Sequence, residues 1–210
     1  MEISYLLIGF TVAFSIWTFS NPDAHLKCRH WPYAEYHSGE YYRWLSSGFI
    51  HGDQMHLLFN MLTLFFFGPA VEHAFVVQFP EIGRLLFIIF YLLSIIAASQ
   101  ATYYHYREVQ SFSSVGASGG VSAVLFASIL MIPGMEIKPM LFPLGIPGFI
   151  YAVFYLWYST QAARRGNDNI DHVAHIFGSV FGFLFPLVLK PLLFLGFLEG
   201  MSNWFRSLGT

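Results

Sequence analysis

Two side chains in mainly apolar stretches of this 210-residue chain could do chemistry together. Ser118 lies within the small-residue sequence GASGG (116–120), and His175 follows soon after the polar segment that precedes the last long apolar run. A serine hydroxyl becomes a nucleophile when a neighbouring base takes its proton, and histidine is the most common such base. If folding brings Ser118 next to His175, the pair could attack a carbonyl carbon.

Glycines offer a way for these two side chains to meet. Gly116 and Gly120 are four residues apart, and so are Gly178 and Gly182. Small residues at this spacing allow two membrane helices to approach closely. The serine lies between the first pair, and the histidine lies one turn before the second pair. We therefore predict that two helices pack through these glycines.

A further polar pair lies near the start of another apolar run. His56 and Asn60 are four residues apart, so they share one face of a helix. Strongly polar residues inside a bilayer are costly and usually mark a functional site. Each feature alone also has an ordinary explanation: helix packing for the glycines, capping for the serine and interfacial anchoring for a histidine. The combination of these features favours a functional site.

The composition indicates the environment of these residues. The chain is 56% hydrophobic and 20% aromatic but only 10% charged, whereas soluble domains carry about 25% charged residues. We therefore expect an integral membrane protein. The formal net charge is -2, and no basic cluster exceeds Arg164-Arg165, which argues against nucleic-acid binding. The single cysteine, Cys28, permits neither an internal disulfide nor a cysteine-based metal site.

Apolar runs and their breaks predict an all-α membrane protein that forms a single domain over 1–210. The expected spans are about 3–19, 55–77, 83–104, 115–132, 140–160 and 172–194. The first of these is expected to be a retained helix and not a cleaved signal. The connection 21–52 is rich in Tyr and His and has no clear periodicity, so we expect a long loop partly embedded in the headgroups.

With these motifs in this order, the sequence resembles the rhomboid family of intramembrane serine proteases. The resemblance covers nearly the whole chain. Its main carriers are GASG at 116–119, AHIFG at 174–178, FIH at 49–51, HLLFN at 56–60 with Gly68 and Glu72 beyond it, and YR at 42–43.

The resemblance implies a six-transmembrane-helix rhomboid-like bundle and an endopeptidase that uses no cofactor or metal. Ser118 would be the nucleophile and His175 the general base. His56, Asn60 and the backbone N–H of Ser118 would stabilise the oxyanion, with Gly116 and Gly119 supporting the site. The substrates would be transmembrane segments of other proteins in the lipid bilayer. We expect a multi-pass protein of the plasma (inner) membrane of a bacterium.

Two residues near the site raise separate questions. Some family members carry an aromatic residue one turn after the nucleophile, where it stacks on the imidazole, but this chain has Ser122 there. Asp171 lies four residues before His175, at the expected start of the helix. A triad carboxylate reaches the imidazole poorly from that position, so we expect Asp171 to cap the helix.

The remaining histidines are expected to have structural roles. His172 is adjacent to the site, and five others are assigned to loops and interfaces: His25, His30, His37, His73 and His105. A metal centre built on the four histidines 51, 56, 172 and 175 is the rival chemistry, but their spacing gives no compact zinc-like set.

Two other classes of protein are alternatives. One is a catalytically inactive relative that binds membrane helices, for which loss of Ser118 or His175 would be the signal. The other is a small transporter, which would have ionisable residues near the middle of several spans. The family's orientation puts Ser118 towards the outside, yet more Lys and Arg residues fall on that side, against the positive-inside rule.

Overall fold

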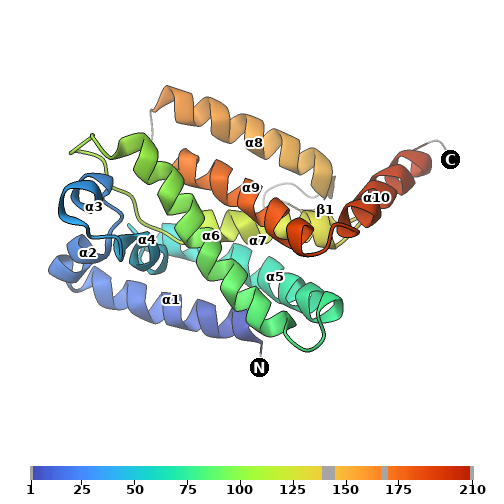
Figure 1. Cartoon of the computed structure of the whole chain (residues 1–210), viewed down its shortest axis with the longest axis horizontal. Coiled ribbons are helices and arrows are strands. Elements are labelled where there is room, and N and C mark those ends of the chain that lie inside the picture. Colours follow the sequence, from blue (N-terminus) through green and yellow to red (C-terminus); the bar gives the residue numbers. More distant parts are fainter. Residues whose placement is uncertain (1, 139–144, 167–169, 209–210) are drawn as a thin grey trace.

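The computed structural model describes residues 2–138, 145–166 and 170–208, and most of them are helical (Figure 1). The longer helices are α1 (Ile3–Phe19), α5 (Gln54–Gln78), α6 (Gly83–Tyr106), α7 (Ser118–Met131), α8 (Gly148–Arg165), α9 (His172–Leu189) and α10 (Leu193–Ser207). A two-residue antiparallel pair, β1 (Glu136–Ile137) and β2 (Ile146–Pro147), precedes α8. The predicted helical class is confirmed.

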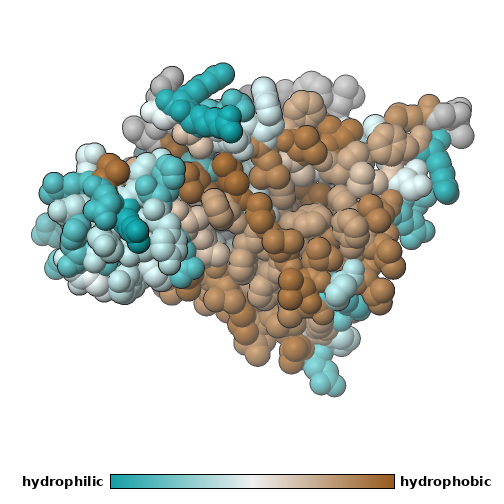
Figure 2. Space-filling view, turned by 45° about the horizontal axis from the view of Figure 1, so that its top comes forward, coloured by the Kyte–Doolittle hydropathy of each residue, from teal (hydrophilic) through white to brown (hydrophobic). Residues whose placement is uncertain are grey.

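The outer surface of the bundle is apolar. Within the described residues, α5, α6 and α9 are long and apolar enough to cross a membrane, and α1 and α7 are shorter apolar helices. Figure 2 shows a broad apolar face, with the largest group of hydrophilic side chains at one end and smaller groups along the edges. Large apolar side chains such as Phe66, Val153 and Val188 are more than 60% exposed, as expected where lipid replaces water. The protein is an integral membrane protein, and six spans remain a prediction.

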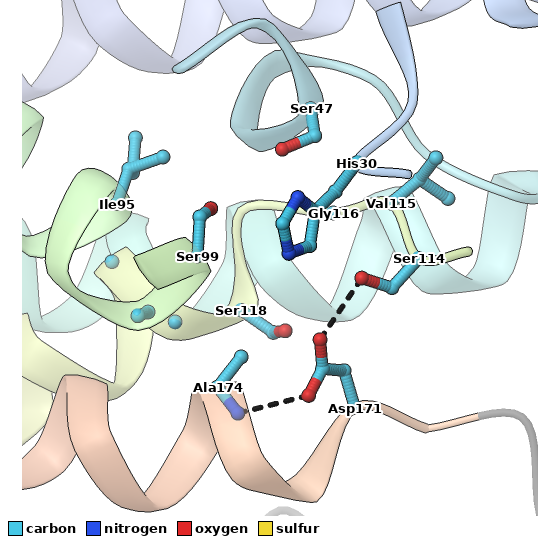
Figure 3. Close-up of a pocket in the computed structure, with 13 residues that line it drawn as sticks. His30, Ser47, Ile95, Ser99, Ser114, Val115, Gly116, Ser118, Asp171 and Ala174 are labelled. Atoms are coloured by element: carbon cyan, nitrogen blue, oxygen red, sulfur yellow. Dashed lines mark hydrogen bonds between the residues drawn. The ribbon is translucent and has the colours of Figure 1, made fainter. Parts of the chain in front are cut away.

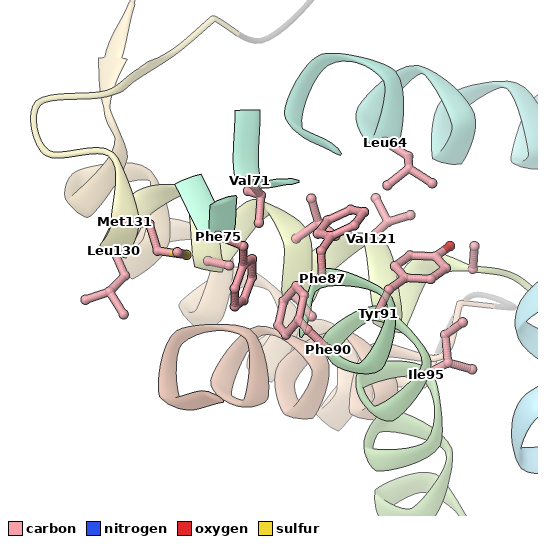
Figure 4. Packing of buried hydrophobic residues seen from close by; sticks show 14 of the residues in the cluster. Leu64, Val71, Phe75, Phe87, Phe90, Tyr91, Ile95, Val121, Leu130 and Met131 are labelled. Carbon is pink, nitrogen blue, oxygen red and sulfur yellow. The ribbon is translucent and has the colours of Figure 1, made fainter. Parts of the chain in front are cut away.

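Helix α7 lies at the centre of the bundle, and every residue from Gly119 to Met131 is buried. Figure 4 shows its side chain Val121 in one cluster with aromatic rings of α5 and α6, among them Phe75 and Phe90. Ser118, the first residue of α7, is only half-buried. The nucleophile candidate therefore lies at the accessible end of a helix that packing holds firmly.

Backbone contact sets the distance between α7 and α9, which form the most extensive helix contact among the described residues. A Cβ atom added to Gly178 would overlap the backbone of Gly119, and one added to Gly182 would overlap the backbone of Ala123. Because α9 lacks side chains at these two positions, its backbone approaches α7 closely. The prediction that Gly178 and Gly182 form a packing face is confirmed.

On the α7 side of this contact, the prediction that Gly116 and Gly120 form the packing face was wrong. Gly116 lies before the helix begins, and Gly120 faces Ile95 and Tyr91 on α6. A spacing of four residues marks one helical face, but it does not say which neighbouring helix that face meets. The face of α7 that meets α9 carries Gly119 and Ala123 instead.

Two helices differ in extent from the predicted spans, which remain predictions. Helix α8 begins at Gly148, directly after β2, and the predicted start of that span, Met140, falls outside the described residues. Helix α9 ends at Leu189 and α10 begins at Leu193, so the predicted span to 194 combines two helices. Pro191 lies in the break and cannot donate a helical hydrogen bond.

The long first loop is folded into short helices. They are α2 (Pro22–Cys28), α3 (Pro32–Ser38), α4 (Arg43–Ser46) and the 3-10 turn η1 (Ser47–Phe49). Pro22 and Pro32 are each the first residue of a helix, a position that suits the fixed φ of proline. Gly39 ends α3 with a φ of 70°, which favours glycine. The sequence predicted a long loop over 21–52 but not these short helices within it.

Arg43 connects two parts of this folded loop. Its side chain is buried, and Nη1 donates to the carbonyl oxygens of Leu26 and Arg29, each at 2.9 Å. Its Nε donates to Glu40 Oε2 at 2.6 Å. The guanidinium thus satisfies carbonyl groups at the end of α2 and fixes that helix against α4.

A buried carboxylate organises the other half of the loop. Glu35 is fully buried and accepts hydrogen bonds from His30 Nδ1 at 2.6 Å, Trp31 N at 2.9 Å and Trp44 Nε1 at 2.9 Å. His30 is only 2% exposed. His30 lies in the connection between α2 and α3, as expected of a loop residue, but its imidazole is in the interior because it pairs with Glu35.

Candidate active site

Ser118 and His175 line one cavity of about 480 Å³. His56 and Asn60, on α5, line the same cavity. Ser118 begins α7 and His175 lies in the first turn of α9, so three helices contribute. The fold therefore brings together all four polar residues that the sequence singled out.

The loop before Ser118 is held by backbone and side-chain contacts to the first loop. The backbones of His30 and Ser114 exchange two hydrogen bonds, each of 3.0 Å. Gly116 N donates to the carbonyl of Ser47 at 3.0 Å. These contacts fix where α7 starts. The N–H groups of its first turn have no helical carbonyl to bind and so form a ready donor site.

Gly116 allows the His56 imidazole to lie against this loop. Its φ of 124° is one that other residues rarely adopt, and an added Cβ would overlap the His56 ring. Asp53 Oδ1 accepts from His56 N at 2.8 Å and caps α5. Asn60 is 6% exposed, and its Nδ2 donates to the His56 carbonyl at 2.9 Å. Gly119 supports the other side through close contact with Ala98 and Gly178.

Asp171 caps α9, as predicted. Its Oδ1 accepts from Ala174 N at 2.9 Å. Figure 3 shows this bond and a second one from Ser114 Oγ, also 2.9 Å. Thr102 Oγ1, on α6, donates to the same carboxylate at 2.9 Å. The side chain therefore joins the start of α9 to α6 and to the loop before Ser118.

We expect Asp171→Asn to lower turnover less than about tenfold and to cost about 1 kcal/mol or less of stability. Asparagine caps nearly as well as aspartate, and the two hydroxyls can turn to meet its amide. Turnover of a cleaved substrate and thermal unfolding of both proteins measure the two quantities. A loss near the roughly 10⁴-fold typical of an amidated triad carboxylate would instead make Asp171 a catalytic residue.

His51 lies between the first loop and α5, outside the membrane-spanning segments, and is fully buried. Its Nε2 accepts from Ala117 N at 3.3 Å, so the ring proton belongs on Nδ1, which lies 2.9 Å from Ser15 Oγ. Burial and, to a smaller extent, the neighbouring His56 lower the pKa of His51 to about 3, against an opposing effect of Asp53. This neutral ring positions the residue before the candidate nucleophile, a role that the motif alone did not indicate.

The protein should lose stability as the pH falls below about 6.5, the pKa of an unfolded-chain histidine. Because His51 has a lower pKa when folded, the unfolded chain binds more protons between pH 6.5 and 3. Its share of the free energy of unfolding should drop by about 2 kcal/mol between pH 7 and pH 5. Unfolding of wild type and His51→Gln at both pH values measures this share. Equal pH dependence in the two proteins would contradict it.

A smaller cavity of about 20 Å³ lies on the other side of Ser118. It has room for about one water molecule. His30, Ser47 and Ser99 contribute polar groups to its wall, and Figure 3 shows the His30 imidazole between Ser47 and Ser118. Nothing near His30 in the sequence indicated this position, because it depends on the fold of the first loop.

The described residues also bear on the metal alternative and on His172. Among them, no group of three or more His, Cys, Asp or Glu side chains is arranged to hold a metal ion.

His172 is buried, and its ring meets Tyr158 and His175 edge-on, with centroid distances of 6.0 and 5.6 Å. Its contacts agree with the structural role expected from the sequence.

The fold is thus that of a helical membrane protein in which a serine and a histidine line one cavity. The chain belongs to the rhomboid family: a family model described as "Rhomboid domain" matches residues 38–192. This range includes every candidate site residue.

Several relatives carry similar sequences. Putative rhomboid protease YdcA of Bacillus subtilis (strain 168) is 29% identical over 153 residues, covering 70% of this chain and 66% of the relative. Rhomboid protease AarA of Providencia stuartii is 26% identical over 171 residues, covering 73% and 58%. RHOMBOID-like protein 12, mitochondrial, of Arabidopsis thaliana is 28% identical over 152 residues, covering 68% and 44%. The chain spans less than two thirds of the length of each of these relatives.

Proposed function

We propose that this protein is an intramembrane serine endopeptidase that hydrolyses peptide bonds in or near transmembrane segments of other membrane proteins. The observation that carries the proposal is the cavity that Ser118 and His175 share at the ends of α7 and α9. Two of the relatives described above are named rhomboid proteases, which supports the same reaction.

In the first half of the reaction, Ser118 Oγ attacks the scissile carbonyl carbon while His175 takes the hydroxyl proton. The tetrahedral intermediate then collapses, the C–N bond breaks, and His175 returns the proton to the leaving amine. An ester to Ser118 remains. In the second half, His175 takes a proton from water and the resulting hydroxide attacks the ester. The ester C–O bond then breaks, His175 returns the proton to Ser118 Oγ, and the new carboxyl product leaves.

The oxyanion of both tetrahedral intermediates requires fixed hydrogen-bond donors. The Ser118 N–H at the start of α7 is one donor, and the side chains of His56 and Asn60 are the others in this proposal. Two contacts support this role. The Asn60 side chain donates a hydrogen bond to the His56 carbonyl, and the His56 ring packs against Gly116. Donors fixed before the reaction need no reorganisation when negative charge develops.

The cavity also suits a peptide segment. Phe59, Val121, Leu125 and Tyr151 provide apolar walls next to the polar residues. An extended stretch of substrate could therefore bury an apolar side chain while its carbonyl faces Ser118. We include in the proposal that the enzyme works in the plasma (inner) membrane of a bacterium. Its matches come from both bacterial and mitochondrial proteins, so membrane fractionation of the source organism is needed to test the location.

The test is cleavage of a model transmembrane substrate by the purified protein in lipid vesicles. We expect a new N-terminus within or near the transmembrane segment, loss of cleavage after treatment with a serine-reactive phosphonate, and mass-spectrometric detection of the label on Ser118. A chelator should leave activity intact. Cleavage that survives the phosphonate but stops with the chelator would favour a metalloprotease.

A further inference from the structure

An aromatic ring from α8 lies next to the candidate base. The ring centroid of Tyr155 is 6.3 Å from that of His175, and the two planes make an angle of 29°. Ring pairs in proteins attract each other at centroid separations of about 4.5 to 7 Å. Position 122 on α7 cannot provide a ring, because it is a serine. In this chain, therefore, the stacked ring comes from a different helix.

Ser122 contributes to this contact in another way. Its Oγ lies 2.7 Å from the hydroxyl of Tyr155, and the side chain is buried. The Tyr155 ring also contacts Phe126 on α7, with centroids 5.6 Å apart, and Tyr151 one turn earlier on α8, at 5.9 Å. The ring is thus held at its hydroxyl end and along its sides before it meets the imidazole.

We propose that Tyr155 is a positioning residue that orients His175 for proton transfer, with Ser122 as its anchor; this rests on the proposed function. A general base must lie within hydrogen-bond reach of the proton it takes, so rotation of the imidazole would slow the reaction even if the substrate still bound. Tyr155 limits that rotation from one side. His172 meets the same imidazole edge-on, with centroids 5.6 Å apart.

The ring and the hydroxyl of Tyr155 can be separated experimentally. The hydrogen bond to Ser122 also connects α8 to α7, so Tyr155 could act merely by holding α8 in place. Tyr155→Phe keeps the ring but removes that connection. Tyr155→Leu removes the ring itself. If orientation of His175 is the role, the ring matters more than the hydroxyl.

The experiment compares kcat and KM for cleavage of the model transmembrane substrate by these purified proteins in vesicles. We expect Tyr155→Leu to lower kcat about tenfold with KM within about twofold, the effect that a lost aromatic pair allows. Phosphonate labelling of Ser118 should slow by a similar factor. Tyr155→Phe and Ser122→Ala should each lose about threefold or less, and the combined variant no more than either alone, because both remove one hydrogen bond.

Two further variants are needed: one that moves the ring from α8 to α7 and should restore activity, and a control that removes an exposed aromatic side chain. Ser122→Tyr combined with Tyr155→Leu puts a ring on α7 in the space that the α8 ring leaves, and it should recover most of the lost kcat. Phe154→Leu removes an aromatic that is 63% exposed on the outer face of α8, so it should leave both constants unchanged. If Tyr155→Leu does not fold, Tyr155→Met removes the ring while keeping more volume.

Several results would overturn this inference. A normal kcat in Tyr155→Leu would show that the ring does not orient the base. Equal losses in the Phe and Leu variants would assign the role to the hydroxyl and α8. A rise in KM at constant kcat would make Tyr155 a substrate contact. A wild-type protein that neither cleaves nor labels would instead remove the proposed function, and this inference with it.

Discussion

Ser118→Ala and His175→Ala should each lower cleavage of a transmembrane substrate by at least about 10⁴-fold, to background. Alanine at 118 removes the atom that attacks the carbonyl. Alanine at 175 removes the group that takes the proton. Because the two act as one unit, the double variant should be no slower than either single variant. The measurement is the rate at which the cut product appears in lipid vesicles, with wild type alongside.

These variants should keep the fold, since neither side chain forms part of the buried cluster around α7. Thermal unfolding within a few degrees of wild type would confirm that the lost activity is chemical. Ser118→Cys is a matched control, because it retains a nucleophilic atom at the same position. A Ser118→Ala protein that still cuts the same bond would end the serine-protease proposal.

Asn60→Ala should lower turnover by about 10² to 10³, the usual effect of removing one oxyanion donor. One N–H of its amide donates to the His56 carbonyl, which fixes the direction of the other N–H. Such a fixed donor contributes most when negative charge develops on the substrate oxygen. The loss should therefore fall on kcat, with little change in KM.

Asn60→Asp is the useful comparison, because it has the same shape but replaces the donor by an acceptor. It should be at least as impaired as Asn60→Ala. A fall in turnover much smaller than 10²-fold would mean that His56 and the Ser118 N–H are sufficient. A change confined to KM would assign Asn60 to substrate binding.

The long helices could be predicted from the sequence because apolar runs end at clear breaks. α1 spans Ile3–Phe19 as expected, α5 is one residue longer at each end than its predicted span, and α6 begins at the predicted residue and ends two residues later. The helices of the first loop were missed, although Pro22 and Pro32 mark their starts, because seven-residue helices are too short for a periodic pattern. α10 was missed because the apolar character continues beyond Pro191.

The site could be predicted to the extent that its residues lie in motifs. Ser118, His175, His56 and Asn60 do line one cavity, and their chemical roles remain predictions. The ring of Tyr155 and the buried position of His30 had no local signal. The Tyr155 ring depends on contacts with α7 and α9, and His30 depends on the fold of the first loop and its pairing with Ser114. A spacing rule describes only one helix at a time. Residue spacing therefore identified the residues of the candidate site but not the contacts that position them.

The contacts around the loop before Ser118 have a consequence for the time at which the protein can become active. The loop is fixed by His30 and Ser47 from earlier in the chain and by Asp171 from later. During synthesis the chain emerges from its N-terminus, so α9 arrives after the serine segment has been made. Until α9 is in place, Ser118 lacks both its proposed base, His175, and the carboxylate of Asp171 that secures its loop. Under the proposed function, a partly synthesised or partly inserted chain would therefore be inert, and the other proteins of the membrane would not be cleaved until assembly is complete.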